Sequence, residues 1–170
     1  MKTDSTGNYP LQAAVELLYI WLTGNGEDQY FGQWSRMVRV LKKSDTMNSL
    51  IESAIDTYIS TGKSFFADTH EFKADSGEDE LYLSTQHFKY EITIAQETRT
   101  AGILWWKHEE ARYTANVTVY DKYNFDKIRE WEGFGNIMNN LAYTYHVLGG
   151  GNDYDWYATY TYATKWTDVH

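Results

Sequence analysis

The sequence has 170 residues, with 24 acidic and 15 basic side chains, a net charge of −9 and no cysteine. A chain of this length suits one domain and buries roughly 70% of its unfolded surface. The absence of cysteine excludes disulfides, thiolate metal sites and cysteine nucleophiles. The acidic balance disfavours partners that carry phosphate charge, which are nucleic acids and anionic membrane surfaces.

Two segments bear on localisation. The longest apolar run, Ala13–Leu22, contains Glu16 and is shorter than the roughly 20 residues of a membrane span, so we expect a core helix and no transmembrane segment. The N-terminal segment Met1–Gly7 carries an acid and lacks an apolar core, so it is not typical of a secretion signal. The localisation therefore stays unknown, and secretion or delivery is expected to use another route.

Apolar residues in the first third of the chain recur with the helical spacing i, i+3, i+4, i+7. We expect helices over Leu11–Leu22, Tyr30–Leu41 and Met47–Ile59, with stops at Gly24-Asn25-Gly26 and near Gly62. The second segment carries the cations Arg36, Arg39, Lys42 and Lys43 on one face. These cations form either a solvated helix face or a phosphate-binding patch.

From Lys63 onward, apolar and polar residues alternate, which is typical of strands with one buried face. We expect strands at Leu81–Leu83, His87–Ile94, Ile103–Lys107, Arg112–Val119 and Tyr154–Trp166, and a helix over Phe134–Tyr145 that Gly149-Gly150-Gly151 ends. Hairpin-length gaps, such as Glu109-Glu110, favour antiparallel pairing.

These elements predict a single α+β domain over residues 1–170. A helical layer at about 10–62 packs against a curved antiparallel sheet or half-open β-barrel at about 63–166, and one further helix precedes the last strand.

The alternating pattern of Arg112–Val119 runs directly into Asp121 and Tyr123. Side chains two residues apart share a face, so Asp121 would continue the inward face of Val119. A buried carboxylate costs several kcal/mol unless it is paired, hydrogen-bonded or bound to a metal. The alternative is that the strand ends at Val119 and that Asp121 is a turn or cap residue.

The last predicted strand places Trp156, Tyr160, Tyr162 and Trp166 on one face. Such a face either fills the core or stacks against sugar rings or lipid headgroups. The five histidines show no spacing that is typical of metal ligands, and we assign no transition metal.

Two stretches, in this order, resemble the catalytic domain of the colicin M family of bacterial toxins, which degrade lipid II, the lipid-linked precursor of peptidoglycan. The first is Tyr19–Gly26, where the family has an apolar helix that runs into Trp-Gly-Asn-Gly. The second is Asp121-Lys122-Tyr123-Asn124-Phe125, where the family motif begins Asp-Lys-Tyr-Asp-Phe. The order of elements over about Leu11–Trp166 is also similar, and the resemblance implies a curved, partly open barrel with peripheral helices.

The resemblance implies Mg²⁺-dependent cleavage between a polyprenyl chain and its pyrophosphate. Asp121 and Tyr123 would occupy the positions of an essential acid and an essential tyrosine, with Asp121 as a metal ligand. Asn124 stands where the family has a second aspartate, and Glu130 and Trp131 stand at the spacing of its His-Arg pair. Asn124, Asp126 and Glu130 would complete the catalytic set, and Arg129 would bind phosphate.

Two hypotheses of function follow from this comparison. In the first, the chain is an antibacterial phosphodiesterase that acts at a membrane surface on lipid II or a related polyprenyl-pyrophosphate sugar, with an immunity protein as a further partner. In the second, the changed motif leaves a catalytically impaired relative that binds lipid-linked sugar or carbohydrate without turnover.

Overall fold

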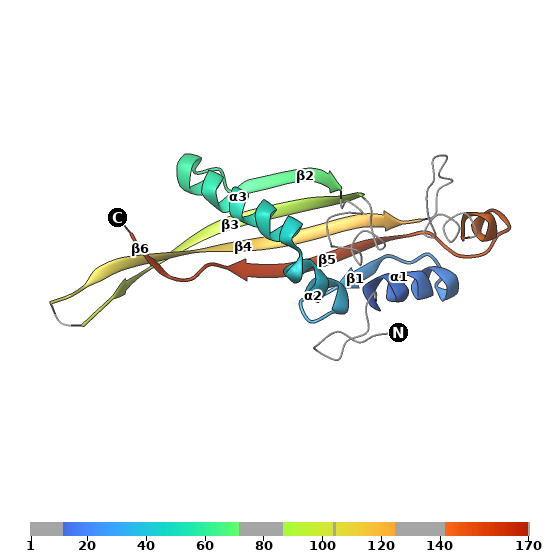
Figure 1. Ribbon diagram of the computed structural model, residues 1–170, viewed down its shortest axis with the longest axis horizontal. Helices are drawn as coiled ribbons and strands as arrows, with labels where there is room; N and C mark the ends of the chain where they lie inside the picture. Colours follow the sequence, from blue (N-terminus) through green and yellow to red (C-terminus); the bar gives the residue numbers. More distant parts are fainter. Residues whose placement is uncertain (1–11, 72–86, 104, 125–141, 170) are drawn as a thin grey trace. The chain divides into compact units, whose positions relative to one another are not determined.

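The computed structural model of the chain describes residues 12–71, 87–103, 105–124 and 142–169. The elements in chain order are α1 (Gln12–Thr23), β1 (Gln29–Phe31), α2 (Arg36–Lys43), α3 (Asp45–Thr61), β2 (Phe65–Glu71), β3 (His87–Ala101), β4 (His108–Tyr123), β5 (Tyr154–Ala163) and β6 (Thr167–Asp168) (Figure 1). Residues 142–147 are also helical. The six strands form a mixed, open sheet in the order β1-β5-β4-β3-β2, and β6 pairs with β4. The prediction of an α+β fold is confirmed.

The chain forms two compact units. The first unit comprises residues 1–30, 72–86 and 120–157, and the second comprises residues 31–71, 87–119 and 158–170. The single domain that we expect from the sequence stays a prediction. In the described part of the chain, no helix has both the length and the apolar character needed to cross a bilayer.

In the first unit, α1 buries one face through Ala13, Leu17 and Trp21. These residues are four apart, which is the spacing of one helix face. The Tyr154 hydroxyl donates a hydrogen bond to the Leu17 carbonyl oxygen at 2.9 Å. This bond satisfies a buried phenol and ties the first residue of β5 to the middle of the helix.

In the second unit, serine caps define where the helices start. The Ser35 hydroxyl accepts a hydrogen bond from the Val38 amide at 3.2 Å and begins α2. Ser44, which is 3% exposed, lies between α2 and α3. Its amide donates to the Leu41 carbonyl at 3.1 Å, and its hydroxyl accepts from the Met47 amide at 3.0 Å. One residue therefore ends α2 and begins α3.

The core of the second unit joins the apolar faces of these helices to one face of the sheet, with α3 against β3. The buried helix residues are Met37, Val38, Leu41, Met47, Ile51, Ala54 and Ile55. The buried strand residues are Phe88, Ile92, Ile94, Ala111, Ala115, Val117, Val119, Ala158 and Tyr160. Tyr58 of α3 meets Tyr113 of β4 edge-on, with ring centroids 5.9 Å apart.

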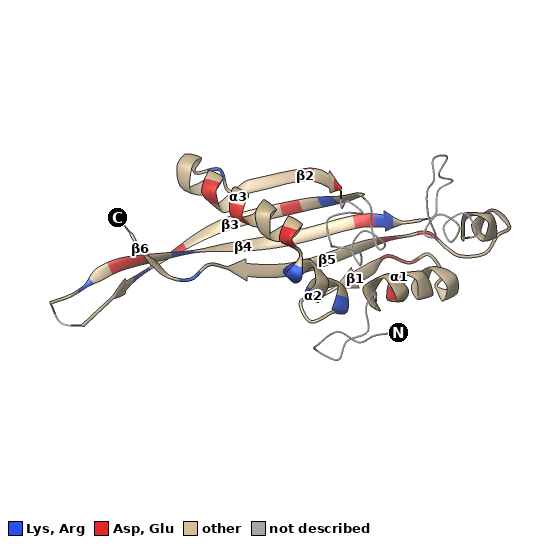
Figure 2. Cartoon of the chain, in the orientation of Figure 1, with Lys and Arg blue, Asp and Glu red and all other residues tan. Residues whose placement is uncertain are grey.

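The four cations of the second predicted helix lie on the exposed side of α2 (Figure 2). Lys42 places its ammonium group 5.6 Å from the centroid of the Tyr160 ring. The exposure of the four cations is compatible with a solvated face and with a phosphate-binding patch.

The sequence-based boundaries are wrong at three places. The predicted strand over Tyr154–Trp166 ends at Ala163. The predicted helix over Tyr30–Leu41 begins only at Arg36, because Tyr30 belongs to β1 and Ser35 caps the helix. Ile103, Trp105, Trp106 and Lys107, which we expected in a strand, lie between β3, which extends to Ala101, and β4. Glu109 and Glu110, which we expected in the hairpin connection, lie inside β4.

Strand β2 is absent from the sequence-based prediction. It pairs antiparallel with β3, from Phe65 opposite Thr93 to Glu71 opposite His87. Most of its residues are exposed, so it lacks the alternation of a half-buried strand. The strand predicted at Leu81–Leu83 and most of the helix predicted at Phe134–Tyr145 lie outside the described residues.

Replacing Ser44 with alanine should lower the free energy of unfolding by about 1 to 2 kcal/mol, because the buried Met47 amide loses its hydrogen-bond acceptor. Denaturant melts measure the change. Ser60→Ala is the matched control, since the exposed Ser60 hydroxyl only donates back to carbonyls of its own helix. Equal stabilities of the two variants would contradict the role of Ser44 as a cap.

Candidate functional site

Asp121 lies within β4, which continues past Val119 to Tyr123. Val119 and Tyr123 are buried, Asp121 is half-buried, and Lys122 between them is exposed. Side chains alternate along a strand, so Asp121 lies on the same face as Val119 and Tyr123. The alternative that the strand ends at Val119 is wrong.

Tyr123 packs as a buried aromatic residue near the end of β4. It is 7% exposed, and its ring stacks on Tyr154 with centroids 5.5 Å apart and planes at 26°. Burial raises the pKa of the Tyr123 hydroxyl above its ordinary value. The phenol therefore stays protonated at neutral pH, where it is suited to donate a hydrogen bond and not to act as a base.

Asp153, directly before β5, gathers three polar neighbours within the first unit. Trp21 Nε1 donates to Asp153 Oδ1 at 3.2 Å, and Lys122 Nζ lies 3.6 Å from Asp153 Oδ2. His146 Nδ1 lies 3.8 Å from Oδ1, which is an ion pair when the imidazole is protonated. The His146 ring also packs 5.8 Å from Trp21, centroid to centroid. A carboxylate, a cation and an imidazole thus gather near the end of β4.

The loop that carries Asp153 is fixed to the end of α1. The Asn152 amide donates to the Trp21 carbonyl at 2.9 Å, and its side-chain nitrogen donates to the Gly24 carbonyl at 2.7 Å. Gly151 has a φ of +71°, and a Cβ there would lie 2.5 Å from the Trp21 ring. Only glycine allows this close approach without strain.

The remaining predicted site residues divide into two groups. Asn124 is half-buried and directly follows β4. Asp126, Arg129 and Glu130 lie outside the described residues, so their predicted roles stay predictions. Sequence reasoning missed the group around Asp153, because its members come from α1, β4 and the segment before β5 and share no local spacing.

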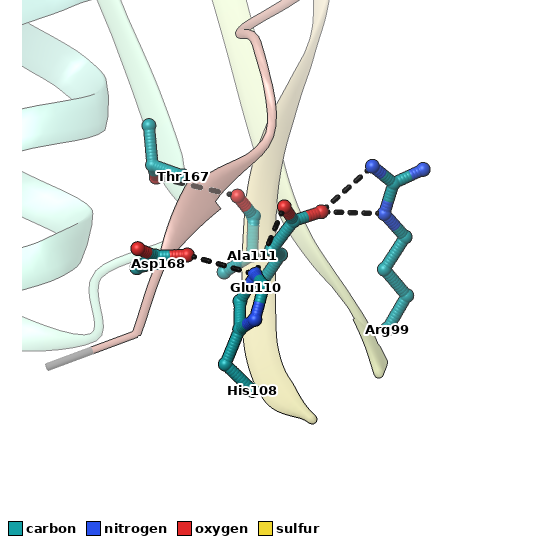
Figure 3. A network of polar contacts seen from close by, with 6 residues as sticks. All are labelled: Arg99, His108, Glu110, Ala111, Thr167 and Asp168. Atoms are coloured by element: carbon teal, nitrogen blue, oxygen red, sulfur yellow. Dashed lines mark hydrogen bonds and ion pairs between the residues drawn. The ribbon is translucent and has the colours of Figure 1, made fainter. Parts of the chain in front are cut away.

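A second polar group lies on β4 and β6 in the second unit (Figure 3). His108 Nε2 lies 3.4 Å from Glu110 Oε1 and 3.2 Å from Asp168 Oδ1. Glu110 and Asp168 are opposite each other in the antiparallel pairing. Among the described residues, these three form the one group of His, Asp and Glu side chains close enough to share a metal ion. They also form two ion pairs when His108 is protonated.

The Mg²⁺ implied by the resemblance is compatible with Asp121 on chemical grounds. Mg²⁺ usually keeps several waters and takes one or two carboxylates together with substrate phosphates. Asp121 offers one carboxylate at a strand end. The nearby carboxylates Asp126 and Glu130 lie outside the described residues.

Crossed ion pairs join β3 and β4 beside the His108 group. Glu110 Oε2 accepts hydrogen bonds from Arg99, and Glu97 Oε2 accepts from Arg112 (Figure 3 draws the first pair). The Arg99 bond lowers the pKa of Glu110, and the bonds from Arg112 and Thr114 lower the pKa of Glu97. Both guanidinium groups also lie over the Trp166 ring, at 4.3 Å for Arg99 and 4.8 Å for Arg112.

Arg99→Gln should raise the pKa of Glu110 towards 4.5, because the charged hydrogen bond that favours the carboxylate is lost. Arg112→Gln should raise the pKa of Glu97 and leave that of Glu110 in place. Carboxyl-carbon NMR titrations of the two variants measure both pKa values. If either variant moved both carboxyls equally, the pairing would be wrong.

Comparison with protein-family models, with curated proteins and with solved structures finds no match to this chain. No relative therefore assigns a role to the residues described above. The resemblance to the colicin M family rests on the two sequence stretches and the order of elements alone.

Proposed function

We propose that the chain is a phosphodiesterase of the colicin M type, which cleaves lipid II or a related polyprenyl-pyrophosphate sugar. The observation that carries the proposal is the extension of β4 to Tyr123, since it gives Asp121 the same face as Tyr123 at the end of a strand. A carboxylate held there by backbone pairing suits a role in catalysis better than one in a flexible turn.

In the proposed reaction, water attacks phosphorus, the bond between phosphorus and the polyprenyl oxygen breaks, and the polyprenol oxygen takes up a proton. Mg²⁺, when bound with the substrate, would neutralise pyrophosphate charge. The Tyr123 phenol donates a hydrogen bond to a phosphate oxygen, and Asp121 orients the attacking water or the ion. Arg129 would contact phosphate, and Asp126 or Glu130 would supply the proton.

The competing hypothesis is a binding domain without turnover, and the packing of Tyr123 favours it. A side chain that is 7% exposed and stacked on Tyr154 is typical of core filling. Trp156 and Tyr160, from the aromatic face predicted on the last strand, are also buried, as expected for residues that fill the core. On the outward side, Tyr30, Tyr157 and Tyr120 stack in series, with centroid separations of 5.0 and 5.8 Å. A row of tyrosine rings such as this suits contact with sugar.

Asp121→Asn should reduce polyprenol release from lipid II in the presence of Mg²⁺ by about 10²-fold or more, because the charged oxygen is lost while the shape is kept. Thin-layer separation of released polyprenol measures the rate. Asp155→Asn, at an exposed position of β5 in the same unit, is the matched control and should keep full activity. If the wild-type chain binds lipid II but releases no polyprenol, the binding domain is the correct function.

Tyr123→Phe separates catalysis from packing, because phenylalanine keeps the ring stack on Tyr154 and removes only the hydroxyl. If the phenol contacts phosphate, the turnover rate should fall by about tenfold or more while the melting temperature stays within a few degrees. Rate assays and thermal melts on the same preparations give both values. Unchanged turnover would leave Tyr123 as a packing residue.

A further inference from the structure

The tip of the β3–β4 hairpin, residues 102–107, has an unusual composition for a turn. Its sequence is Gly102-Ile103-Leu104-Trp105-Trp106-Lys107. Exposed turns favour Gly, Pro, Asn, Asp and Ser, whereas this one has a run of large apolar residues. Ile103 is 78% exposed, Trp105 is 87% exposed and Trp106 is 80% exposed. Keeping such residues in water is unfavourable, and in the described structure nothing covers them.

Two backbone features of the described tip residues are specific. The Trp106 amide donates a hydrogen bond to the Ile103 carbonyl oxygen at 3.0 Å. Gly102 has a φ of +100°, and a Cβ at this position would collide with the Trp106 carbonyl oxygen. The close approach of Gly102 to Trp106 therefore requires glycine, and Ile103, Trp105 and Trp106 are exposed beside it.

Charged and aromatic contacts join the two strands of the hairpin below the tip. The Arg99–Glu110 and Arg112–Glu97 pairs join its two strands, and Trp166 lies under both guanidinium groups. Strand β6 adds the contact between Asp168 and His108, the first residue of β4 (Figure 3). These contacts join β3, β4 and β6 directly below the tip.

The size and shape of the tip disfavour a folded protein as the partner. A stable protein interface takes about 800 Å² and 20 to 30 residues from each side. The tip is a narrow turn whose apolar surface comes from a few adjacent residues. A lipid bilayer can accommodate such a protrusion without a matching cavity.

The residue types of the tip suit the interfacial layer of a bilayer. Tryptophan is enriched at the level of the lipid headgroups because its ring is apolar and its N–H is polar. Ile103 would extend into the acyl region, while Lys107, at the edge of the turn, can keep its ammonium group among the headgroups.

We propose that the hairpin tip inserts into the interfacial layer of a lipid bilayer and anchors the chain reversibly to a membrane surface. The proposal does not depend on the proposed enzyme activity, since insertion needs neither lipid II nor turnover. The net charge of −9 and the neighbouring Glu109 and Glu110 oppose attraction to anionic lipid. Binding should therefore be driven by apolar burial and should not increase when anionic lipid is added.

The test measures how the full chain partitions onto phosphatidylcholine vesicles by co-sedimentation, with and without phosphatidylglycerol. Trp105→Ala and Trp106→Ala should each weaken partitioning by about tenfold, and the double variant by about 100-fold. Trp34→Ala is the matched control, because Trp34 is as exposed as Trp105, at 87%, but lies outside the hairpin. It should bind vesicles as the wild type does.

Quenching of tryptophan fluorescence by brominated lipid gives a second readout, which the double variant should lose in part and Trp34→Ala should retain. The proposal is overturned if the wild type stays in the supernatant, if the double variant binds as well as the wild type, or if Trp34→Ala loses as much binding. It is also overturned if the wild type forms a dimer without lipid and the double variant is a monomer, because the tip would then be an interface between copies.

Discussion

The pairing and alternation of β4 are the constraint on which both proposals depend. Its backbone pattern continues from His108 to Tyr123 without a break, so the orientation of each side chain follows from its position in the strand. At one end this pattern directs His108 and Glu110 towards β6. At the other end of β4, the same alternation places Asp121 and Tyr123 on one face of the strand. A shift of one residue would exchange the two faces and remove both arrangements at once.

The sequence predicted those parts of the fold where apolar spacing is regular. The helix over Met47–Ile59 corresponds to α3, and the alternation of Arg112–Val119 corresponds to the central part of β4. The predicted start of the second helix was wrong, because exposed aromatic residues happen to have the spacing of a buried helix face. Tyr30 and Trp34 fit a helical spacing but are 74% and 87% exposed, and the cap at Ser35 decides where α2 begins. Strand β2 was missed because both of its faces are largely exposed.

Some residues of the candidate site could be identified from the sequence, and others could not. Asp121 and Tyr123 could be found because they continue a strand and stand in a motif that resembles a family pattern. Asp153 and His146 could not, because the contacts of Asp153 with Lys122 and with His146 depend on how the loop before β5 packs on Trp21. The same limit applies to Asp168, which reaches His108 only through the pairing of β6 with β4. Contacts of this kind come from tertiary structure and leave no spacing in the sequence.

The double role of Ser44 has a consequence for how this chain can vary in length. Since its amide ends α2 and its hydroxyl begins α3, no spare residue separates the two helices. One inserted residue would turn the following helix by about 100° about its axis and move Met47 and Ile51 away from the core. Insertions at this junction should therefore be rare among homologous sequences, whereas the boundary after Gly62, in a left-handed conformation at φ +75°, offers a more tolerant position.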